Sequence, residues 1–300
     1  MDYIGSCIHS ACLHLKMDSD GRSNGAKYEC LLFDMDDTLY PMSSGLNLAC
    51  RKNIEEYMIQ HLQIDESEVP KMCLELYREY GTTMAGLKAL GYQFDNDEFH
   101  AYIHGRLPYD TLKPDPVLRN LLLSIPQRKI IFTNADKAHT AQVLNRLGLE
   151  DCFEGVICFE TLNQLPLEPD SNLDDEPDER AFFTESEYEG YTNGNSFVGP
   201  KSQILCKPCL EAIEAAIQIA NIDPNKTIFF DDSARNIASG KVAGLHTVIV
   251  GSSVPVPGAD IALSSIHNLK EALPEIWEGE EGDQLEQVLQ STAVETVVLA

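Results

Sequence analysis

Residues 31–40 read LLFDMDDTLY, and this stretch decides the fold because an apolar run leads directly into three aspartates. The run from Tyr28 to Phe33 has the length and the apolar character of a buried strand. Asp34 and Asp36 follow it immediately. Carboxylates this close together repel one another and raise each other's pKa, so we expect a positive group among them.

Four further apolar runs have strand length: KIIFTN from Lys129, GVICF from Gly155, TIFF from Thr227 and HTVIV from His246. Strands that are apolar on both faces are typical of a parallel sheet with helices on either side. Strands and helices alternate, because helical patterns begin near Pro116, Ala138, Pro208 and Ala234. The sequence therefore predicts an α/β protein with a Rossmann-like, doubly wound parallel sheet.

The segment 45–111 interrupts this alternation with several helical patterns and no strand. It predicts an all-helical cap domain inserted after the first strand. The predicted catalytic core then comprises residues 28–44 and 112–270, and LKPDP at residues 112–116 is the expected hinge.

The formal net charge of −26 is concentrated outside the patterned parts. Residues 168–189 hold ten acidic side chains and one basic, and residues 275–300 hold seven acidic and no basic side chains. We therefore predict a mobile N-terminal extension, an acidic disordered insertion in the core and an acidic C-terminal tail, at residues 1–27, about 163–202 and 271–300. No cluster of Lys and Arg offers a footprint to phosphates, which argues against a nucleic-acid partner, whereas a protein partner for the acidic segments stays open.

Nine cysteines without regular spacing are typical of reduced thiols in an intracellular protein. The amino end lacks the basic start and the continuous apolar run of a secretory signal, and no apolar run reaches membrane-spanning length. We therefore expect a cytoplasmic protein with no membrane partner, and the nucleus stays open as a location.

Polar side chains follow three of the predicted strands: Asp34 and Asp36, then Thr133 and Asn134, then Asp231 and Asp232. The carboxyl ends of parallel strands meet at one edge of the sheet, where the ligand site of such folds lies. Oxygen ligands without His or Cys favour a hard divalent cation, and Mg²⁺ is the cofactor that we expect. A carboxylate can also act as a nucleophile toward phosphorus.

Four ordered motifs resemble those of the haloacid dehalogenase superfamily in its phosphatase form: DMDDT at Asp34, FTNA at Thr133, CKPC at Lys207 and FFDDS at Asp231. The resemblance implies that Asp34 attacks phosphorus and forms an aspartyl-phosphate. It also implies that Asp36 protonates the leaving oxygen and then activates water. We expect neighbouring anions to raise the pKa of Asp36 and so to keep a proton on it.

The resemblance also implies roles for the other residues. Lys207 would neutralise charge on the transferring phosphoryl group, while Thr133 and Asn134 would donate hydrogen bonds to its oxygens. Mg²⁺ would be held by Asp34, the backbone carbonyl of Asp36, and one or both members of the pair Asp231 and Asp232. The sequence does not choose the direct ligand within that pair.

Stretches around these motifs resemble the pyrimidine 5′-nucleotidase branch of fungi and plants, which implies a nucleoside 5′-monophosphate as the small phosphate ester. Ala85 stands where fungal members carry an arginine, so base specificity stays open. Two alternatives also stay open. One is a phosphatase or mutase for another small metabolite, such as a sugar phosphate; the other is a regulatory or interaction protein that uses its acidic segments.

Several remaining residues have structural interpretations. We expect Thr38 to orient the aspartate loop, and Asn236 either to support the acidic pair or to cap its helix. His139 is expected to have a surface or core role. Cys206 and Cys209 have C-x-x-C spacing, but no second pair matches it, so we expect packing thiols rather than a metal or redox site.

Overall fold

The computed structural model describes residues 27–163 and 204–277, which belong to one compact unit, Lys27–Glu278. The predicted acidic insertion and nearly all of the predicted N-terminal extension and C-terminal tail lie outside the described residues. Within the described parts of the chain, no helix has both the length and the apolar character needed to cross a membrane.

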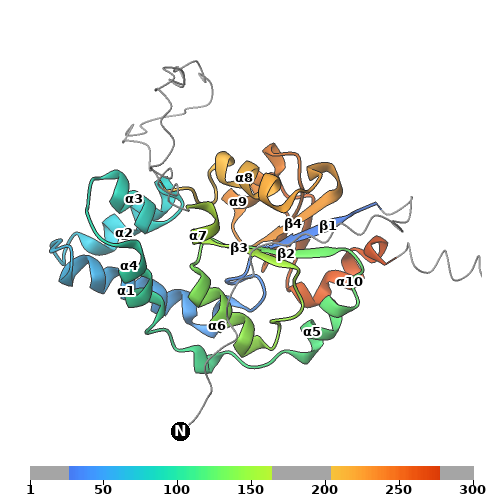
Figure 1. The fold of residues 1–300 in the computed structure, drawn as a ribbon, viewed down its shortest axis with the longest axis horizontal. Helices are drawn as coiled ribbons and strands as arrows, with labels where there is room; N and C mark the ends of the chain where they lie inside the picture. The colour runs from blue at the N-terminus through green and yellow to red at the C-terminus, as the bar shows by residue number, and fades with distance from the viewer. Residues whose placement is uncertain (1–26, 164–203, 278–300) are drawn as a thin grey trace, which may run out of the picture. The chain divides into compact units, whose positions relative to one another are not determined.

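A six-stranded sheet with the order β3-β2-β1-β4-β5-β6 forms the centre of the unit, and all its neighbouring strands are parallel (Figure 1). The strands are β1 Cys30–Phe33, β2 Arg128–Phe132, β3 Gly155–Ile157, β4 Thr227–Asp231, β5 His246–Val250 and β6 Ile261–Leu263. The chain runs outward from β1 in both directions, so the predicted doubly wound fold is confirmed. The short strand β6 was not predicted.

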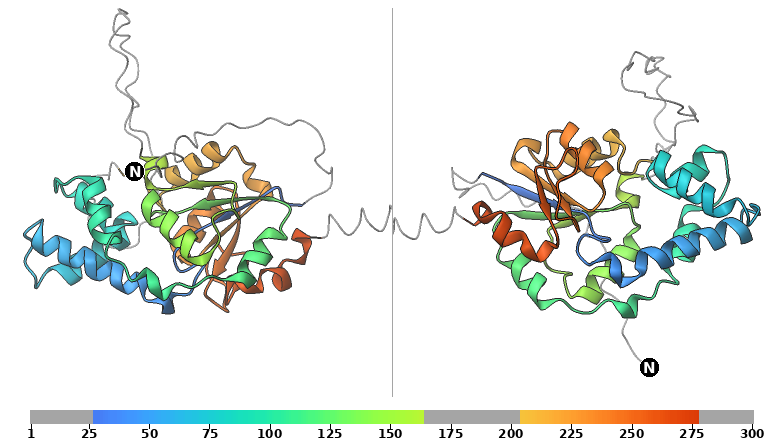
Figure 2. Two further views of the ribbon diagram at one scale, coloured as in Figure 1. Left: turned by 60° about the horizontal axis from the view of Figure 1, so that its bottom comes forward. Right: turned by 180° about the vertical axis from the view of Figure 1, so that it is seen from behind.

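Alternate residues of the strands face two separate apolar clusters, one on each side of the sheet. Leu31 and Phe33 of β1 pack with helices on one side, while Cys30 and Leu32 pack with helices on the other. The first set of helices comprises α5 Pro116–Leu123, α6 Lys137–Leu147 and α10 Leu269–Ala272. The second set comprises α8 Leu210–Ala220 and α9 Ala234–Val242, and Figure 2 shows the two sets on opposite faces. Burial on both faces explains why β1 is apolar at every position.

Helices occupy the chain between β1 and β2: α1 Leu46–Gln60, α2 Val69–Tyr80, α3 Thr83–Ala89 and α4 Asn96–His104. We call residues 46–104 the helical insertion. Thr82 and Asp95 begin α3 and α4, because each side chain accepts a hydrogen bond from a backbone N–H of the first turn. The insertion packs around a cluster of its own, which Phe159 of the short helix α7 (Phe159–Leu162) joins. The predicted helices are confirmed, while the role of the insertion as a cap stays a prediction.

The described chain continues past residue 271, where the predicted tail begins. Short 3₁₀ helices at Ile266–Asn268 and Pro274–Ile276 flank α10. Ile276 is buried, and the indole N–H of Trp277 donates a hydrogen bond to the carbonyl of Ser124 at 2.8 Å. Packed structure therefore extends to Trp277.

Candidate active site

In-register strands bring the predicted site residues to one edge of the sheet. Phe33 of β1 pairs with Ile131 of β2 and with Phe230 of β4, so these three neighbouring strands end at nearly the same level. Asp34 follows β1 directly, and its backbone N–H donates to the carbonyl of Phe230 at 2.8 Å. Asp231 is the last residue of β4.

Lys207 lies at the centre of this edge and is almost completely buried. Its Nζ donates to Oδ1 of Asp34 at 2.7 Å, to Oδ2 of Asp231 at 2.8 Å and to the carbonyl of Phe132 at 2.7 Å. Burial alone would lower the pKa of Lys207, but the charges of the two carboxylates outweigh it and raise the pKa. Lys207 is therefore a fixed cation, and it is the positive group expected among the aspartates.

The acidic pair after β4 occupies two different environments. Asp231 is fully buried, and its carboxylate accepts hydrogen bonds from Lys207, the backbone N–H of Ser233 and the side-chain amide of Asn236. Asp232 is partly exposed and accepts no hydrogen bond from the residues that the structure describes. Asn236 thus supports the acidic loop, one of its two predicted roles, and Asp232 is the carboxylate left available.

The carboxylates of Asp34, Asp231 and Asp232 converge so closely that one oxygen from each lies within 4.8 Å of the others. Burial and the charge of Asp231 raise the pKa of Asp34 to about 7, although Lys207 opposes them. Burial and the charges of Asp34 and Asp231 raise the pKa of Asp232 to about 8. An oxygen-only donor set that holds more negative charge than one lysine balances fits a hard divalent cation such as Mg²⁺.

Asn134 and Thr133 are both expected to bind phosphate oxygens, but their side chains differ in the hydrogen bonds that they already make within the protein. Asn134 accepts a hydrogen bond from the backbone N–H of Lys207 at 2.8 Å and donates one to its carbonyl at 3.0 Å. Thr133 accepts from the N–H of Ala135 at 3.1 Å, which leaves its hydroxyl proton for another acceptor. Asn134 therefore holds the loop that carries Lys207, whereas Thr133 retains a donor at the strand end. Thr38 donates to Oδ2 of Asp34 at 2.9 Å and orients it, as predicted.

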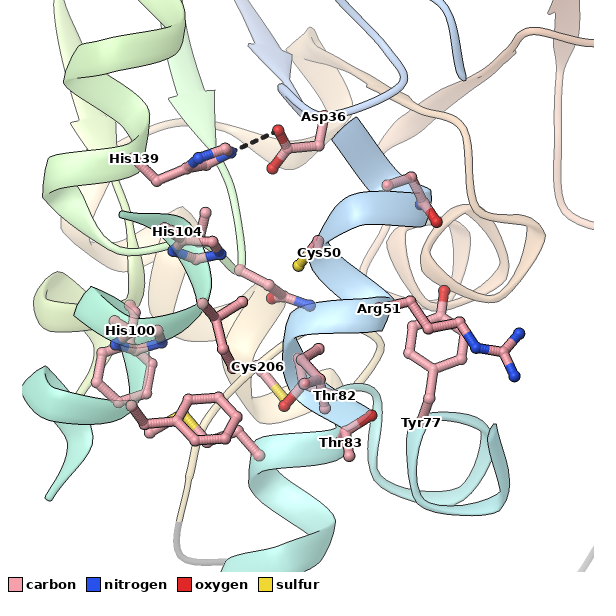
Figure 3. Close-up of a pocket in the computed structure, with 18 of the residues that line it drawn as sticks. Asp36, Cys50, Arg51, Tyr77, Thr82, Thr83, His100, His104, His139 and Cys206 are labelled. Carbon is pink, nitrogen blue, oxygen red and sulfur yellow. Dashed lines mark hydrogen bonds and ion pairs between the residues drawn. The ribbon is translucent and has the colours of Figure 1, made fainter. Parts of the chain in front are cut away.

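The side chain of Asp36 lies in surroundings unlike those of Asp34. Its Oδ1 accepts a hydrogen bond from Nε2 of His139 at 2.8 Å (Figure 3) and another from the hydroxyl of Tyr40 at 2.5 Å. Burial alone would raise the pKa of Asp36, but the charge of His139 and the two hydrogen bonds outweigh it and lower the pKa. The expectation that neighbouring anions raise this pKa is therefore wrong, because His139 lies closer than the sequence indicated.

His139 is the site residue that sequence reasoning missed. It is 3% exposed, and it belongs to a group of stacked rings that joins the core to the helical insertion. His104 of α4 stacks on His139 with centroids 4.4 Å apart, and it pairs with Asp136 at the start of α6. No motif flags this group, because its members come from α4 and α6 and are brought together only by the fold.

A cavity of about 420 Å³ opens from Asp36 toward the helical insertion (Figure 3). Its lining is mostly apolar and aromatic, and it includes Arg51, whose Nε donates to the carboxylate of Glu55 at 2.9 Å. Ala85 is fully buried and does not line the cavity. Cys206 lines it with a thiol that donates to the carbonyl of Tyr80 at 3.3 Å and has no part in the carboxylate cluster.

The sequence matches a known protein family. A sequence model described as a haloacid dehalogenase-like hydrolase matches residues 28–178, which is half of the chain. Phosphate metabolism protein 8 of Saccharomyces cerevisiae is 31% identical over an alignment of 132 residues, and the match covers 41% of this chain and 41% of the yeast protein. The chain therefore matches about two fifths of the length of that curated relative.

Solved structures with a similar fold include β-phosphoglucomutase of Clostridium difficile, with 16% identity, a TM-score of 0.47 and coverage of 86% of this chain and 99% of that one. A HAD phosphatase from Thermococcus onnurineus has 16% identity and a TM-score of 0.46, with coverage of 81% and 96%. TM-scores below 0.5 at these identities give no weight to a particular reaction.

Proposed function

Because the chain belongs to the haloacid dehalogenase-like hydrolases, we propose that it hydrolyses a small phosphate monoester through an aspartyl-phosphate formed on Asp34. The observation that carries this proposal is the contact of Lys207 with both Asp34 and Asp231 at the ends of two neighbouring strands. A buried lysine beside a nucleophile can neutralise the charge of an incoming phosphoryl group. The yeast relative, whose name refers to phosphate metabolism, supports the same class of substrate.

The proposed reaction has two halves. In the first, an oxygen of Asp34 forms a bond to phosphorus while the bond from phosphorus to the ester oxygen breaks, and Asp36 gives a proton to that oxygen. In the second, water attacks phosphorus, its proton passes to Asp36, and the bond from phosphorus to Asp34 breaks. The lowered pKa of Asp36 favours the carboxylate form that the second half needs, so the first half draws on the minority of molecules in which Asp36 is protonated. Thr133 and Asn134 are proposed to donate to the phosphoryl oxygens, Asn134 with whatever donor its bonds to Lys207 leave free.

We propose that Asp34, Asp232 and the backbone carbonyl of Asp36 hold Mg²⁺. Asp231 supports them as the buried partner of Lys207, because its own oxygens already accept hydrogen bonds from protein groups. When bound, Mg²⁺ would neutralise the carboxylates and the phosphate so that the two anions can approach.

A nucleoside 5′-monophosphate is the proposed substrate, on the resemblance of the motif stretches to pyrimidine 5′-nucleotidases. The cavity volume of about 420 Å³ is within the usual range for a small-molecule site. Arg51 offers the cavity a cationic group from α1, although Ala85 stands where the fungal pattern has an arginine. Arg51 of α1 is therefore the residue that we propose to contact the base, in place of an arginine at position 85 of α3.

Phosphate release from UMP, CMP, AMP, FMN and hexose phosphates, with Mg²⁺ and with a chelator, tests the proposal. We expect UMP or CMP to have a kcat/KM at least about tenfold above the hexose phosphates, since a site with polar contacts to a base discriminates at this level. Release should stop in the chelator and return with added Mg²⁺. A preference for a hexose phosphate would replace the nucleotidase assignment, and absence of release from every ester would overturn the phosphatase assignment.

A further inference from the structure

His139 contacts a reacting group that the proposed function uses, yet no motif of the sequence includes it. Its Nε2 lies 2.8 Å from Oδ1 of Asp36, and the hydroxyl of Tyr40 lies 2.5 Å from the same oxygen. The second oxygen, Oδ2, accepts no hydrogen bond from the described part of the chain. Two donors on one oxygen fix the carboxylate while leaving the other oxygen free.

Contacts from both sides hold the imidazole of His139 in this place. The hydroxyl of Tyr109 lies 2.8 Å from Nδ1, so the two ring nitrogens face different partners. Nε2 carries a proton for Asp36 both in the charged ring, whose Nδ1 donates to the hydroxyl of Tyr109, and in the neutral ring, whose Nδ1 accepts from it. His104 of the helical insertion covers the ring face with centroids 4.4 Å apart.

Asp36 is partly buried, with 38% of its side chain exposed, so contacts with the protein decide which rotamer it holds. An exposed aspartate samples several rotamers, and displacement of a reacting group by about 1 Å can cost about 100-fold in rate. His139, by contrast, is 3% exposed and packed against two elements. Rigid support is therefore available from His139 and not from solvent.

We propose that His139 is a positioning residue: its Nε2 holds Oδ1 of Asp36, so that Oδ2 is directed to the ester oxygen and later to the attacking water. The inference rests on the proposed function, since it specifies how Asp36 is oriented for it. Because His104 packs on His139 from α4, docking of the helical insertion also fixes Asp36. The insertion thus contributes to the proposed chemistry through its contact with His139.

His139→Leu and His139→Gln test this role, since leucine fills the space without a donor and glutamine restores an N–H donor. His267→Leu is the matched control, because Nε2 of His267 also lies 2.8 Å from a carboxylate oxygen, that of Asp115, outside the site. Each variant is assayed on UMP, whose alkoxide leaving group needs a proton. The burst of nitrophenolate from 4-nitrophenyl phosphate is measured in parallel, because that leaving group departs without one.

We expect His139→Leu to lower kcat on UMP about 100-fold with KM changed less than about threefold, and to change the burst rate less than about threefold. His139→Gln should recover at least a tenth of the wild-type kcat, roughly tenfold above the leucine variant. Activity of His267→Leu should equal that of the wild type. Equal losses on both substrates, no rescue by glutamine, or no loss at all would each overturn the positioning role.

Side-chain ¹⁵N NMR of the histidines separates failure of this inference from failure of the proposed function. The ring signals of His139 should shift in Asp36→Asn and stay unchanged in Asp115→Asn, and those of His267 should do the reverse. This result would hold in a protein that hydrolysed no ester, which would overturn the proposed function alone. Unchanged His139 signals in Asp36→Asn would overturn the inference even where phosphate release is rapid.

Discussion

Asp34 and Asp36 stand two positions apart on one loop, yet they enter regions of opposite electrostatic character. The region around Asp34 is crowded with carboxylates, and burial with the charge of Asp231 raises its pKa to about 7. The region around Asp36 is lined by histidine and tyrosine, and its pKa is lowered by His139 and by hydrogen bonds despite burial. Two identical side chains thus acquire different chemistry from the elements that surround them.

This difference between the surroundings of Asp34 and Asp36 shows how the loop after β1 can supply two carboxylates with different proposed roles. Side chains two positions apart on an extended strand point to the same side, so the divergence of Asp34 and Asp36 comes from the turn that begins at Asp36, after β1 has ended. Asp34 meets Lys207 and the end of β4, while Asp36 meets α6 and, through His139, the helical insertion. The proposed nucleophile and the proposed proton-transfer group are therefore two positions apart in sequence and separate in environment.

The largest expected effect comes from replacing the proposed nucleophile Asp34. It lies in the region of Asp34, Asp231 and Asp232, which we call the carboxylate side. Asp34→Asn should lower kcat for UMP by more than about 1,000-fold, because no other group can form the covalent intermediate. The fold should be retained, since asparagine keeps one oxygen that can accept from Lys207, and its amide can donate to the hydroxyl of Thr38. Circular dichroism checks the fold, and substantial phosphate release by the folded variant would reject Asp34 as the nucleophile.

Loss of the central cation should be the next largest effect and should damage both stability and activity. Lys207→Met leaves Asp34 and Asp231 as buried, unpaired carboxylates, and breaking a buried ion pair in this way costs about 3–5 kcal/mol of unfolding free energy. Lys241→Met is the control, because Lys241 pairs with Asp260 on the surface and should lose less than about 1 kcal/mol. Denaturant unfolding measures both, and equal losses would contradict a central role for Lys207.

The proposed division of labour between Asp231 and Asp232 predicts a selective loss of metal binding. Asp232→Asn should weaken Mg²⁺ binding about 10- to 100-fold while leaving the metal-free protein at least as stable as the wild type, because it removes a carboxylate that is repelled by its neighbours. Asp231→Asn should destabilise the metal-free protein, since Lys207 would lose a partner. Isothermal titration with Mg²⁺ and thermal unfolding in a chelator distinguish the two, and the reverse pattern would exchange their roles.

The region that contains His100, His104 and His139, which we call the histidine side, predicts a smaller effect, a dependence of stability on pH. Burial and the nearby charge of His104 lower the pKa of His100 to about 4 in the folded protein, against about 6.5 when unfolded. Between these values the unfolded chain binds a proton that the folded protein does not, so the contribution of His100 to stability falls as pH drops from 6.5 to 4. His100→Leu should remove about 3 kcal/mol of this decline relative to the wild type. Denaturant unfolding at pH 7, 6, 5 and 4 measures it, and parallel curves would contradict the shift.

The carboxylate side could be predicted from the sequence because each of its members follows an apolar run. A strand ends where polar residues begin, and parallel strands end at a common edge of the sheet. The sequence alone therefore predicts that Asp34, Thr133 and Asp231 lie close together. Lys207 was assigned through the ordered motifs. The choice between Asp231 and Asp232 needed coordinates, because alternation alone does not say which of two adjacent side chains meets Lys207.

The histidine side could not be predicted for a physical reason. His104 and His139 lie on separate helices, and their contact depends on how the helical insertion packs on α6. The placement of β6 was missed because three residues between polar turns are too short to show a period. The direction of the pKa shift of Asp36 was predicted wrongly because the prediction considered only its neighbours in the sequence. The contact with His139, which depends on the fold, lowers this pKa.

Acid quenching during turnover of UMP, followed by borohydride reduction and peptide mass mapping, tests the central claim most directly. Borohydride converts an aspartyl-phosphate into homoserine, so the residue that carried the phosphoryl group is identified by its mass. We predict homoserine at position 34 in the wild type and none in Asp34→Asn. Modification of Asp36 instead, or unmodified Asp34 while phosphate is being released, would contradict the account.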